Sequence, residues 1–206
     1  NEINKIFFSS TGSVYGEPKI SPTKEDHIFP IQTSLYGSSK LACEGLIQAY
    51  SSGFGFFSKI FRFVSIMGQR YSHGHLYDFY KQLLKNKNKL NVLGNGLQKK
   101  SYLNVNDCIE AMLFTINRNK QPVEIFNLGT ERFITVNHSI KTISKILNIN
   151  PKIYYKGGKR GWIGDSPKIY LDTKKIRNIG WRPKKTIEES IEETIEFFNQ
   201  NKWLFK

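Results

Sequence analysis

The 206-residue chain has few or none of several features that define large classes of protein. Its two cysteines, Cys43 and Cys108, are too few for a disulfide scaffold or a zinc site, so we expect no bound metal and a reducing, cytoplasmic compartment. No run approaches the roughly 18 apolar residues that span a bilayer. The first residues do not form a signal peptide. A membrane partner is therefore not expected.

Glycine-rich phosphate loops are absent as well. The fingerprint that binds the pyrophosphate of a dinucleotide is a G-x-G-x-x-G turn between a strand and a helix. Gly94 and Gly96 come near it, but Lys99 stands where the third glycine should be. Initiator methionine is also missing, and an apolar run begins within a few residues. We therefore expect a chain entered in the middle of a longer protein.

Positive charge is the most prominent feature of the composition. Lysine and arginine together number 31 and the acids 17, which gives a net charge of +14. Nucleic acid is a reasonable first hypothesis for such a protein. However, 24 of the basic residues are lysines and seven are arginines, the residue expected to make bidentate base and phosphate contacts. This favours a solvated basic surface or a phosphate-bearing ligand over nucleic acid.

Short apolar runs alternate with helical patterns, which is typical of an α/β protein with parallel strands. The side chain of Thr33 or Ser34 would cap the first helix, and that of Asn106 or Asp107 a later one. The predicted strands lie at 5–8, 58–64, 90–93, 102–105 and 124–128, and the predicted helices run to about 51, over 76–87, to about 117, over 136–147 and over 186–198.

Tyrosine and lysine recur four residues apart, a spacing that places both side chains on one face of a helix. With ten tyrosines and 24 lysines, chance predicts roughly one such pair, and five occur. Context favours Tyr36 and Lys40 over the helical rival Tyr77 and Lys81, because the preceding strand ends in a cluster of hydroxyl side chains. Ligands bind beyond the carboxyl ends of parallel strands, so we expect Thr11 to lie close to Tyr36 and Lys40.

Seven segments, in order, resemble the extended short-chain dehydrogenase/reductase family, and most of all its nucleotide-sugar epimerases of the UDP-glucose 4-epimerase type. The resemblance covers nearly the whole chain. It rests on FSSTGSVYGEP (8–18), YGSSKL (36–41), RFVSIMGQR (62–70), GNGLQKKSYLNVND (94–107), FNLG (126–129), GDSP (164–167) and LDT (171–173).

The resemblance implies a carboxyl-terminal part of a Rossmann-type parallel sheet over residues 1–70. A smaller α/β domain that binds a nucleotide-sugar would follow over 71–206, with 122–147 as a segment that can return to the Rossmann sheet. On the order of 100 residues of that sheet, at about 30 per βαβ unit, would be missing. Alone, the chain would then expose a sheet edge and bind NAD weakly or not at all.

The implied reaction is NAD-dependent epimerisation of a UDP-hexose through a transient 4-keto sugar, in an enzyme that can form a homodimer. By resemblance, Tyr36 is the catalytic base or acid, Lys40 binds the nicotinamide ribose and favours the phenolate, and Thr11 hydrogen-bonds the reacting hydroxyl. The other implied contacts are Ser9 and Phe63 to the nicotinamide, Ser65 to the substrate, Asn91 and Leu93 to the uracil, and Lys100 and Arg160 to the diphosphate.

Several positions depart from the family pattern. Asn is usual where Ser65 stands, Arg where Lys100 stands and Asp where Ser101 stands, so the identity of the sugar is left open. In the related 4,6-dehydratases an acidic pair supplies the proton transfers of elimination, whereas Gly12 and Ser13 cannot ionise. Epimerisation is thus favoured over a dehydratase or reductase. A non-catalytic remnant whose basic face binds an acidic partner is the alternative from another class.

Overall fold

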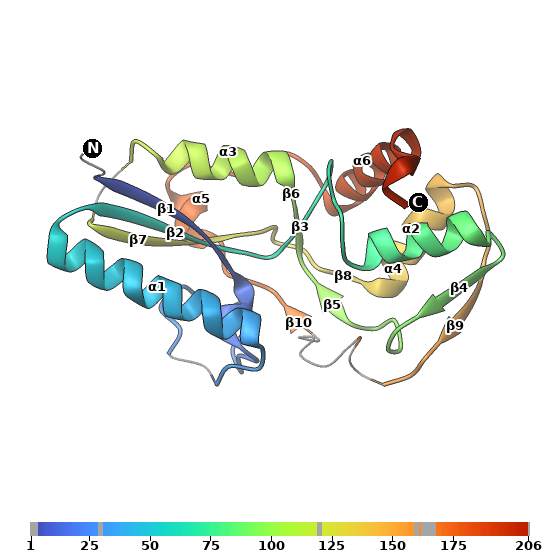
Figure 1. Ribbon diagram of the computed structural model, residues 1–206, viewed down its shortest axis with the longest axis horizontal. Coiled ribbons are helices and arrows are strands. Elements are labelled where there is room, and N and C mark those ends of the chain that lie inside the picture. The colour runs from blue at the N-terminus through green and yellow to red at the C-terminus, as the bar shows by residue number, and fades with distance from the viewer. Residues whose placement is uncertain (1–3, 29–30, 119–120, 159–160, 162–167, 206) are drawn as a thin grey trace.

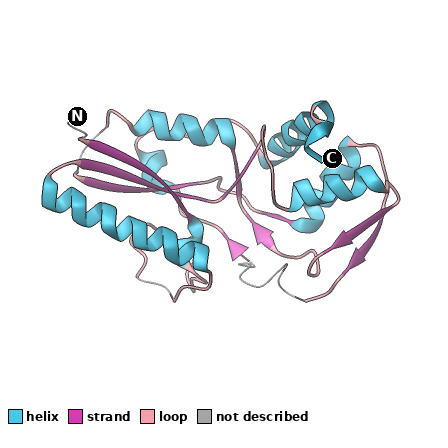
Figure 2. Ribbon diagram, in the orientation of Figure 1, coloured by secondary structure: helices cyan, strands magenta, loops and turns pink. Residues whose placement is uncertain are grey.

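The computed structural model describes residues 4–28, 31–118, 121–158, 161 and 168–205, and the chain folds around two hydrophobic cores. Figure 1 shows two parts side by side, with β1 in one and α6 in the other. The longest strands lie in the first part, while the second is built mainly of helices and one pair of short strands (Figure 2).

The first part is organised by a parallel sheet in the order β1-β2-β7. Its strands are β1 (Lys5–Thr11), β2 (Phe57–Phe63) and β7 (Val123–Leu128). Thr11 is in register with Phe63, and Phe63 with Leu128, so the three carboxyl ends lie at one edge. Parallel strands place their ligand sites at this edge.

Helices cover both faces of this sheet, α1 (Leu35–Phe54) on one and α3 (Val105–Thr115) on the other (Figure 1). The short helix α5 (Lys174–Asn178) lies beside β7, and a 3-10 turn, η1 (Gly12–Tyr15), follows β1. The core between these elements consists of Val14, Tyr15, Phe61, Val64, Leu103, Cys108, Ala111, Phe126, Leu128, Leu171, Ile176 and Trp181.

The second part packs three helices beside a two-stranded parallel sheet. The helices are α2 (His75–Lys85), α4 (Val136–Ile146) and α6 (Ile187–Gln200), followed by the 3-10 turn η2 (Lys202–Phe205), and the strands are β4 (Lys89–Val92) and β9 (Lys152–Tyr155). Apolar residues recur on the inner face of α6, at Ile187, Ile191, Ile195 and Phe198, and all four are buried.

Five short strands lie between the two parts. β3 (Ser65–Met67) pairs with β6 (Tyr102–Asn104), and β5 (Lys99–Lys100) lies between β8 (Ile134–Thr135) and β10 (Lys168–Ile169). Because β3 follows β2 almost directly, the chain passes from the carboxyl edge of the large sheet straight into this central region. The carboxyl edge of the large sheet is therefore directly connected to the central strands.

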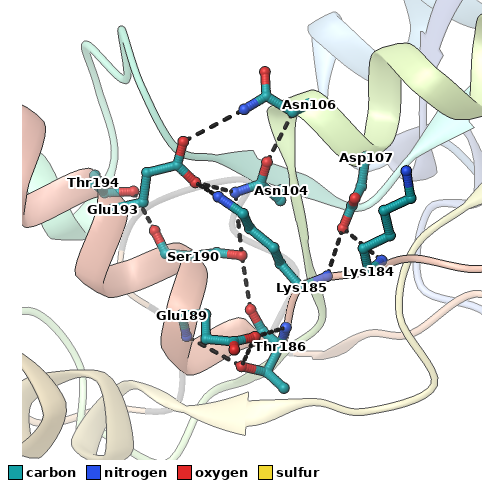
Figure 3. Close-up of polar contacts among 10 residues, drawn as sticks. All are labelled: Asn104, Asn106, Asp107, Lys184, Lys185, Thr186, Glu189, Ser190, Glu193 and Thr194. Atoms are coloured by element: carbon teal, nitrogen blue, oxygen red, sulfur yellow. Dashed lines mark hydrogen bonds and ion pairs between the residues drawn. The ribbon is translucent and has the colours of Figure 1, made fainter.

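A polar cluster ties α6 to β6 and α3, and Figure 3 shows it at close range. The Glu193 carboxylate accepts hydrogen bonds from Asn104 Nδ2 at 2.7 Å and Lys185 Nζ at 2.5 Å. Asp107 Oδ2 accepts from the backbone amides of Lys184 and Lys185 at 3.1 and 3.0 Å. These contacts fix the segment that leads into the last helix.

The expected α/β class with parallel strands is confirmed, and Ser34 rather than Thr33 caps α1, since its side chain accepts from the Gly37 amide at 2.9 Å. The predicted cap at Asn106 or Asp107 is wrong. Asn104 Oδ1 accepts from the Asn106 amide at 2.9 Å, so α3 begins at Val105. Among the described residues no helix is both long and apolar enough to cross a membrane.

Segment 122–147 divides between the two parts. β7 lies in the large sheet, whereas α4 packs against α6 in the second part. The sequence analysis did not predict β9, α5 or the shortest strands. A domain boundary near residue 70 stays a prediction.

Candidate active site

A cavity of about 900 Å³ lies beyond the carboxyl ends of β1 and β2. One wall is formed by the ends of these strands and the first turn of α1, and the other by α2, β4 and the short central strands. Seven of the residues predicted from the sequence line it: Thr11, Tyr36, Phe63, Ser65, Asn91, Leu93 and Lys100. The fold therefore brings together residues that are up to 89 positions apart in the chain.

Tyr36 is held at the cavity by the way α1 begins. The Ser34 cap fixes the first turn, and Gly37 brings that turn against η1. A Cβ at Gly37 would lie 2.7 Å from the Ser13 carbonyl oxygen, closer than two such atoms can approach. Tyr36 is 57% exposed and lines the cavity.

Lys40 lies one turn further along α1. Its ammonium donates to the Ser9 carbonyl oxygen at 2.9 Å, and is 4.8 Å from the centre of the Phe8 ring and 5.9 Å from that of Tyr36. Ser9 and Lys40 thus contact each other at the end of β1, next to the cavity rather than in its wall. The ammonium stands between the strand end and the tyrosine.

The rival pair, Tyr77 and Lys81, has the same internal geometry but another setting. Lys81 Nζ is also 5.9 Å from the centre of the Tyr77 ring. However, the Tyr77 hydroxyl donates to the Leu204 carbonyl oxygen at 2.9 Å, in the core between α2 and η2. Tyr77 is not among the residues that line the cavity. Position in the fold, and not the four-residue spacing, distinguishes the two pairs.

Thr11 caps the turn that follows β1. Its Oγ1 accepts from the Ser13 amide at 3.1 Å and lies 3.3 Å from Ser13 Oγ. Thr11 and Ser13 both line the cavity, so two residues with hydroxyl groups lie in its wall at the end of β1. Arg160 and the GDSP segment at 164–167 lie outside the described residues.

Residues of α2 supply much of the cavity wall, and the sequence analysis did not identify them as part of the site. Lys81 and Lys85 line the cavity together with Lys100, against one aspartate, Asp78. Lys81, Gln82 and Lys85 follow Asp78 at three, four and seven positions, so all four share one helix face. This polar stripe on an otherwise amphipathic helix is the signal that could have identified them. The lysines make this end of the cavity suited to a phosphate group.

His75 lies in the wall between α2 and β6. Its Nδ1 is 3.4 Å from the Tyr102 hydroxyl, and its ring meets the Phe79 ring edge-on at 5.6 Å. Burial, assisted by the Lys100 ammonium, lowers the pKa of His75 to about 3. The imidazole is therefore neutral at physiological pH.

A buried polar network lies behind the strand ends. Arg62 on β2 donates to Glu44 on α1 and, at 2.7 Å, to the Tyr15 hydroxyl of η1. The Tyr15 hydroxyl in turn donates to Asn127 Oδ1 on β7 at 2.8 Å. Burial raises the pKa of Tyr15 to about 12, so this hydroxyl stays protonated and acts as a hydrogen-bond donor. The network joins the elements that carry Thr11, Tyr36 and Phe63.

Known proteins resemble this chain in sequence and in fold. The sequence profile of the NAD dependent epimerase/dehydratase family matches residues 1–129. The human dTDP-D-glucose 4,6-dehydratase is 30% identical over 208 residues, which are 97% of this chain and 57% of that protein. The structure of the UDP-glucose 4-epimerase of Thermotoga maritima with UDP-glucose is 30% identical, with a TM-score of 0.86, over 97% of this chain and 65% of that one.

A crystal structure of a UDP-galactose 4-epimerase matches 98% of this chain and 65% of its own, with a TM-score of 0.85 and 29% identity. The chain thus spans less than two thirds of the length of these relatives. The matched fold is a parallel α/β protein of the Rossmann type, and its carboxyl strand edge carries the cavity. The chain belongs to the NAD dependent epimerase/dehydratase family.

Proposed function

We propose that this chain carries the catalytic tyrosine and the substrate cavity of an NAD-dependent UDP-hexose 4-epimerase. The observation that carries the proposal is the convergence of Thr11, Tyr36 and Phe63 with Asn91, Leu93 and Lys100 on one cavity. The first three come from the sheet edge and the others from the second part. Residues 1–70 with β7 would serve the cofactor, and most of 71–206 the substrate.

The acid and base steps fall to Tyr36. Its Oη would take the proton of the sugar 4-hydroxyl and return a proton after the 4-keto sugar has presented its other face. Thr11 Oγ1 would hold that hydroxyl in place, and the Lys40 ammonium lies on the same face of α1, 5.9 Å from the centre of the Tyr36 ring. The lysines at the α2 end of the cavity would hold the diphosphate.

The residues present fit the nicotinamide half of NAD. A lysine ammonium has three N–H donors, so the bond from Lys40 to Ser9 leaves donors for a ribose diol. Phe63, in the cavity wall, offers an apolar surface for the ring. Bound NAD would supply the hydride acceptor and donor at the sugar carbon.

The choice between epimerase and dehydratase rests on two residues, because relatives of both kinds are about 30% identical to this chain. Elimination needs an acid and a base beside the sugar. A Cβ at Gly12 would lie 3.1 Å from the Phe63 carbonyl oxygen and 3.3 Å from Leu171 Cδ1, which leaves little room for an acidic side chain. Ser13 lines the cavity and cannot ionise. Both observations support epimerisation.

Pairing with a second copy is proposed through α1. Leu46, Tyr50 and Phe54 expose more than half of their side chains on this helix, and the rings of Tyr50 and Phe54 stack at 5.3 Å. Such a run of exposed apolar side chains is typical of an interface. A shift from dimer to monomer in Leu46→Glu, measured by light scattering on the full gene product, would support this arrangement, and an unchanged mass would exclude it.

The experiment for the catalytic assignment compares Tyr36→Phe with Tyr77→Phe in the full gene product. We expect kcat with UDP-hexose to fall about 10²- to 10⁴-fold in Tyr36→Phe, the usual contribution of a general base. Tyr77→Phe is the matched control, since it loses the same hydroxyl one helix away from the reaction. Equal rates in wild type and Tyr36→Phe would exclude the assignment. A product that lacks its C6 hydroxyl would identify a dehydratase.

A further inference from the structure

One edge of β4 faces the cavity, and within the described part of the chain no strand pairs with it. The Lys152 amide donates to the Asn88 carbonyl and the Lys156 amide to the Val92 carbonyl, both at 2.9 Å, so even-numbered residues of β4 point their backbone toward β9. Backbone groups alternate along a strand. Those of Asn91 and Leu93 therefore point to the opposite edge, and both residues line the cavity.

Glutamine side chains cover this open edge. Gln82 Nε2 donates to the Asn91 carbonyl oxygen at 3.1 Å, and the Asn91 amide donates to Gln82 Oε1 at 3.0 Å. Gln98 Nε2 donates to the Leu93 carbonyl oxygen at 3.3 Å. Gln82 thus pairs its whole carboxamide with one residue of the strand, as a neighbouring strand would.

A carboxamide edge has the same adjacent donor and acceptor as the imide edge of a pyrimidine base. In uracil and thymine, N3–H lies beside a carbonyl oxygen, as Nε2–H lies beside Oε1 in glutamine. The backbone of Asn91 can donate its N–H to, and accept at its C=O from, either the glutamine or the base, but the two planar groups cannot occupy the same place at once. Gln82 belongs to α2 and lines the cavity itself, so a base that reaches Asn91 must meet it.

We propose that the Gln82 side chain occupies the place of the nucleobase on the open edge of β4, so that nucleotide binding must displace it. This inference rests on the proposed function, which places a nucleotide in the cavity. Gln82 then sets the affinity for the nucleotide, because the contacts that the base gains are offset by those that the glutamine gives up. The lysines on the same face of α2 attract the phosphates whatever the position of the glutamine.

The test is the dissociation constant of UDP for the full gene product and for Gln82→Ala, measured by calorimetry. We expect UDP to bind about tenfold more tightly to Gln82→Ala, which corresponds to about 1.4 kcal/mol. Gln48→Ala is the matched control, because Gln48 Nε2 also donates to a backbone carbonyl, that of Glu44 at 3.1 Å, on α1. Its affinity for UDP should equal that of the wild type.

Pyrophosphate, which has no base, separates the base from the phosphates. Its affinity should be the same for wild type and Gln82→Ala. Equal or weaker UDP binding in Gln82→Ala, or an equal gain for pyrophosphate, would overturn the role of Gln82 while leaving the nucleotide site in place. If no variant binds UDP, both this inference and the proposed substrate are wrong, whereas the Tyr36→Phe comparison tests the reaction without reference to Gln82.

Discussion

Arg62 on β2 donates hydrogen bonds to both carboxylate oxygens of Glu44 on α1, and this ion pair is buried. Arg62 Nη2 lies 2.7 Å from Glu44 Oε2, and Nε lies 3.1 Å from Oε1. Ser10 also donates to this carboxylate. The contact fixes α1 against the sheet, and therefore fixes Tyr36 and Lys40 relative to the strand end.

Removal of one partner should be costly because the other charge stays buried. Glu44→Ala should lower the free energy of unfolding by about 3–5 kcal/mol, the usual cost of breaking a buried ion pair. The measurement is urea denaturation at pH 7. Glu192→Ala, at an exposed position of α6, is the control and should change stability by less than about 0.5 kcal/mol. A similar small change for Glu44→Ala would mean that solvent reaches the pair.

The neutral imidazole of His75 predicts a pH dependence of stability. An unfolded histidine takes up a proton near pH 6.5, whereas burial lowers the pKa of the folded one to about 3. Between these values the unfolded state binds more protons, so stability falls as the pH falls, by about 1.4 kcal/mol per pH unit. Above about pH 6.5 His75 is neutral in both states, so the protein loses none of its stability through this group.

His75→Phe removes the titration and keeps an aromatic ring beside Phe79 and Tyr102. Denaturation of both proteins between pH 7 and pH 4 gives the test, because the other groups titrate alike in each. As the pH decreases, the wild type should lose more stability than the variant. Two parallel profiles would show that the folded His75 takes up its proton as readily as the unfolded one.

Sequence patterns predicted the parts of the site that depend on local chemistry. Tyr36 and Lys40 could be chosen among five candidate pairs because a strand with hydroxyl residues precedes them. Their placement follows from the general rule that ligands bind beyond the carboxyl ends of parallel strands. The structure places Thr11 and Tyr36 in the wall of one cavity and Lys40 beside it, and their catalytic roles stay predictions.

Long-range polar contacts could not be predicted in the same way. Glu44 lies on a helix whose sequence gives no reason to expect a buried carboxylate, because its partner is on another element. Gln82 resembles any other polar residue of an amphipathic helix until β4 folds against α2. The start of α3 was misplaced because Asn104, Asn106 and Asp107 are all good caps, and the pairing of β6 with β3 selects the first.

Asp107 and Thr186 stabilise the same segment by different means, as Figure 3 shows. Asp107 accepts two backbone amides, while Thr186 caps α6 and exchanges hydrogen bonds with Glu189. Thr186→Ala should cost about 1 kcal/mol, the usual value of a helix cap. Asp107→Ala should cost more, about 2 kcal/mol, because two amides lose their acceptor.

Thermal denaturation of the two variants and of the double variant would measure both effects. The two amides that Asp107 accepts belong to the residues directly before the cap, so the double variant should lose less than the sum of the single losses. Strict additivity would show that the segment from 184 to 186 does not act as a unit.

Gly37 and Gly45 lie on the same helix, but we expect their replacement by alanine to have opposite effects on stability. Apart from its chain neighbours and the backbone of its own helix, a Cβ at Gly45 would meet no described atom within 4 Å, so Gly45→Ala should stabilise α1 by about 0.5–1 kcal/mol, the helix propensity difference. A Cβ at Gly37 would lie 2.7 Å from the Ser13 carbonyl oxygen and 2.9 Å from Gln32 Oε1. The first of these is a backbone atom, which cannot rotate away.

For Gly37→Ala the clash outweighs the propensity. Overpacking typically costs about 1–3 kcal/mol, so a net loss of about 1 kcal/mol is expected. Relief of the clash moves the first turn of α1 away from η1, and Tyr36 moves with it. The kcat of the folded Gly37→Ala variant of the full gene product should therefore fall. Gly45→Ala should leave kcat unchanged. Full activity in a destabilised Gly37→Ala protein would show that η1 moves instead, and that the position of Tyr36 is set by the sheet rather than by Ser13.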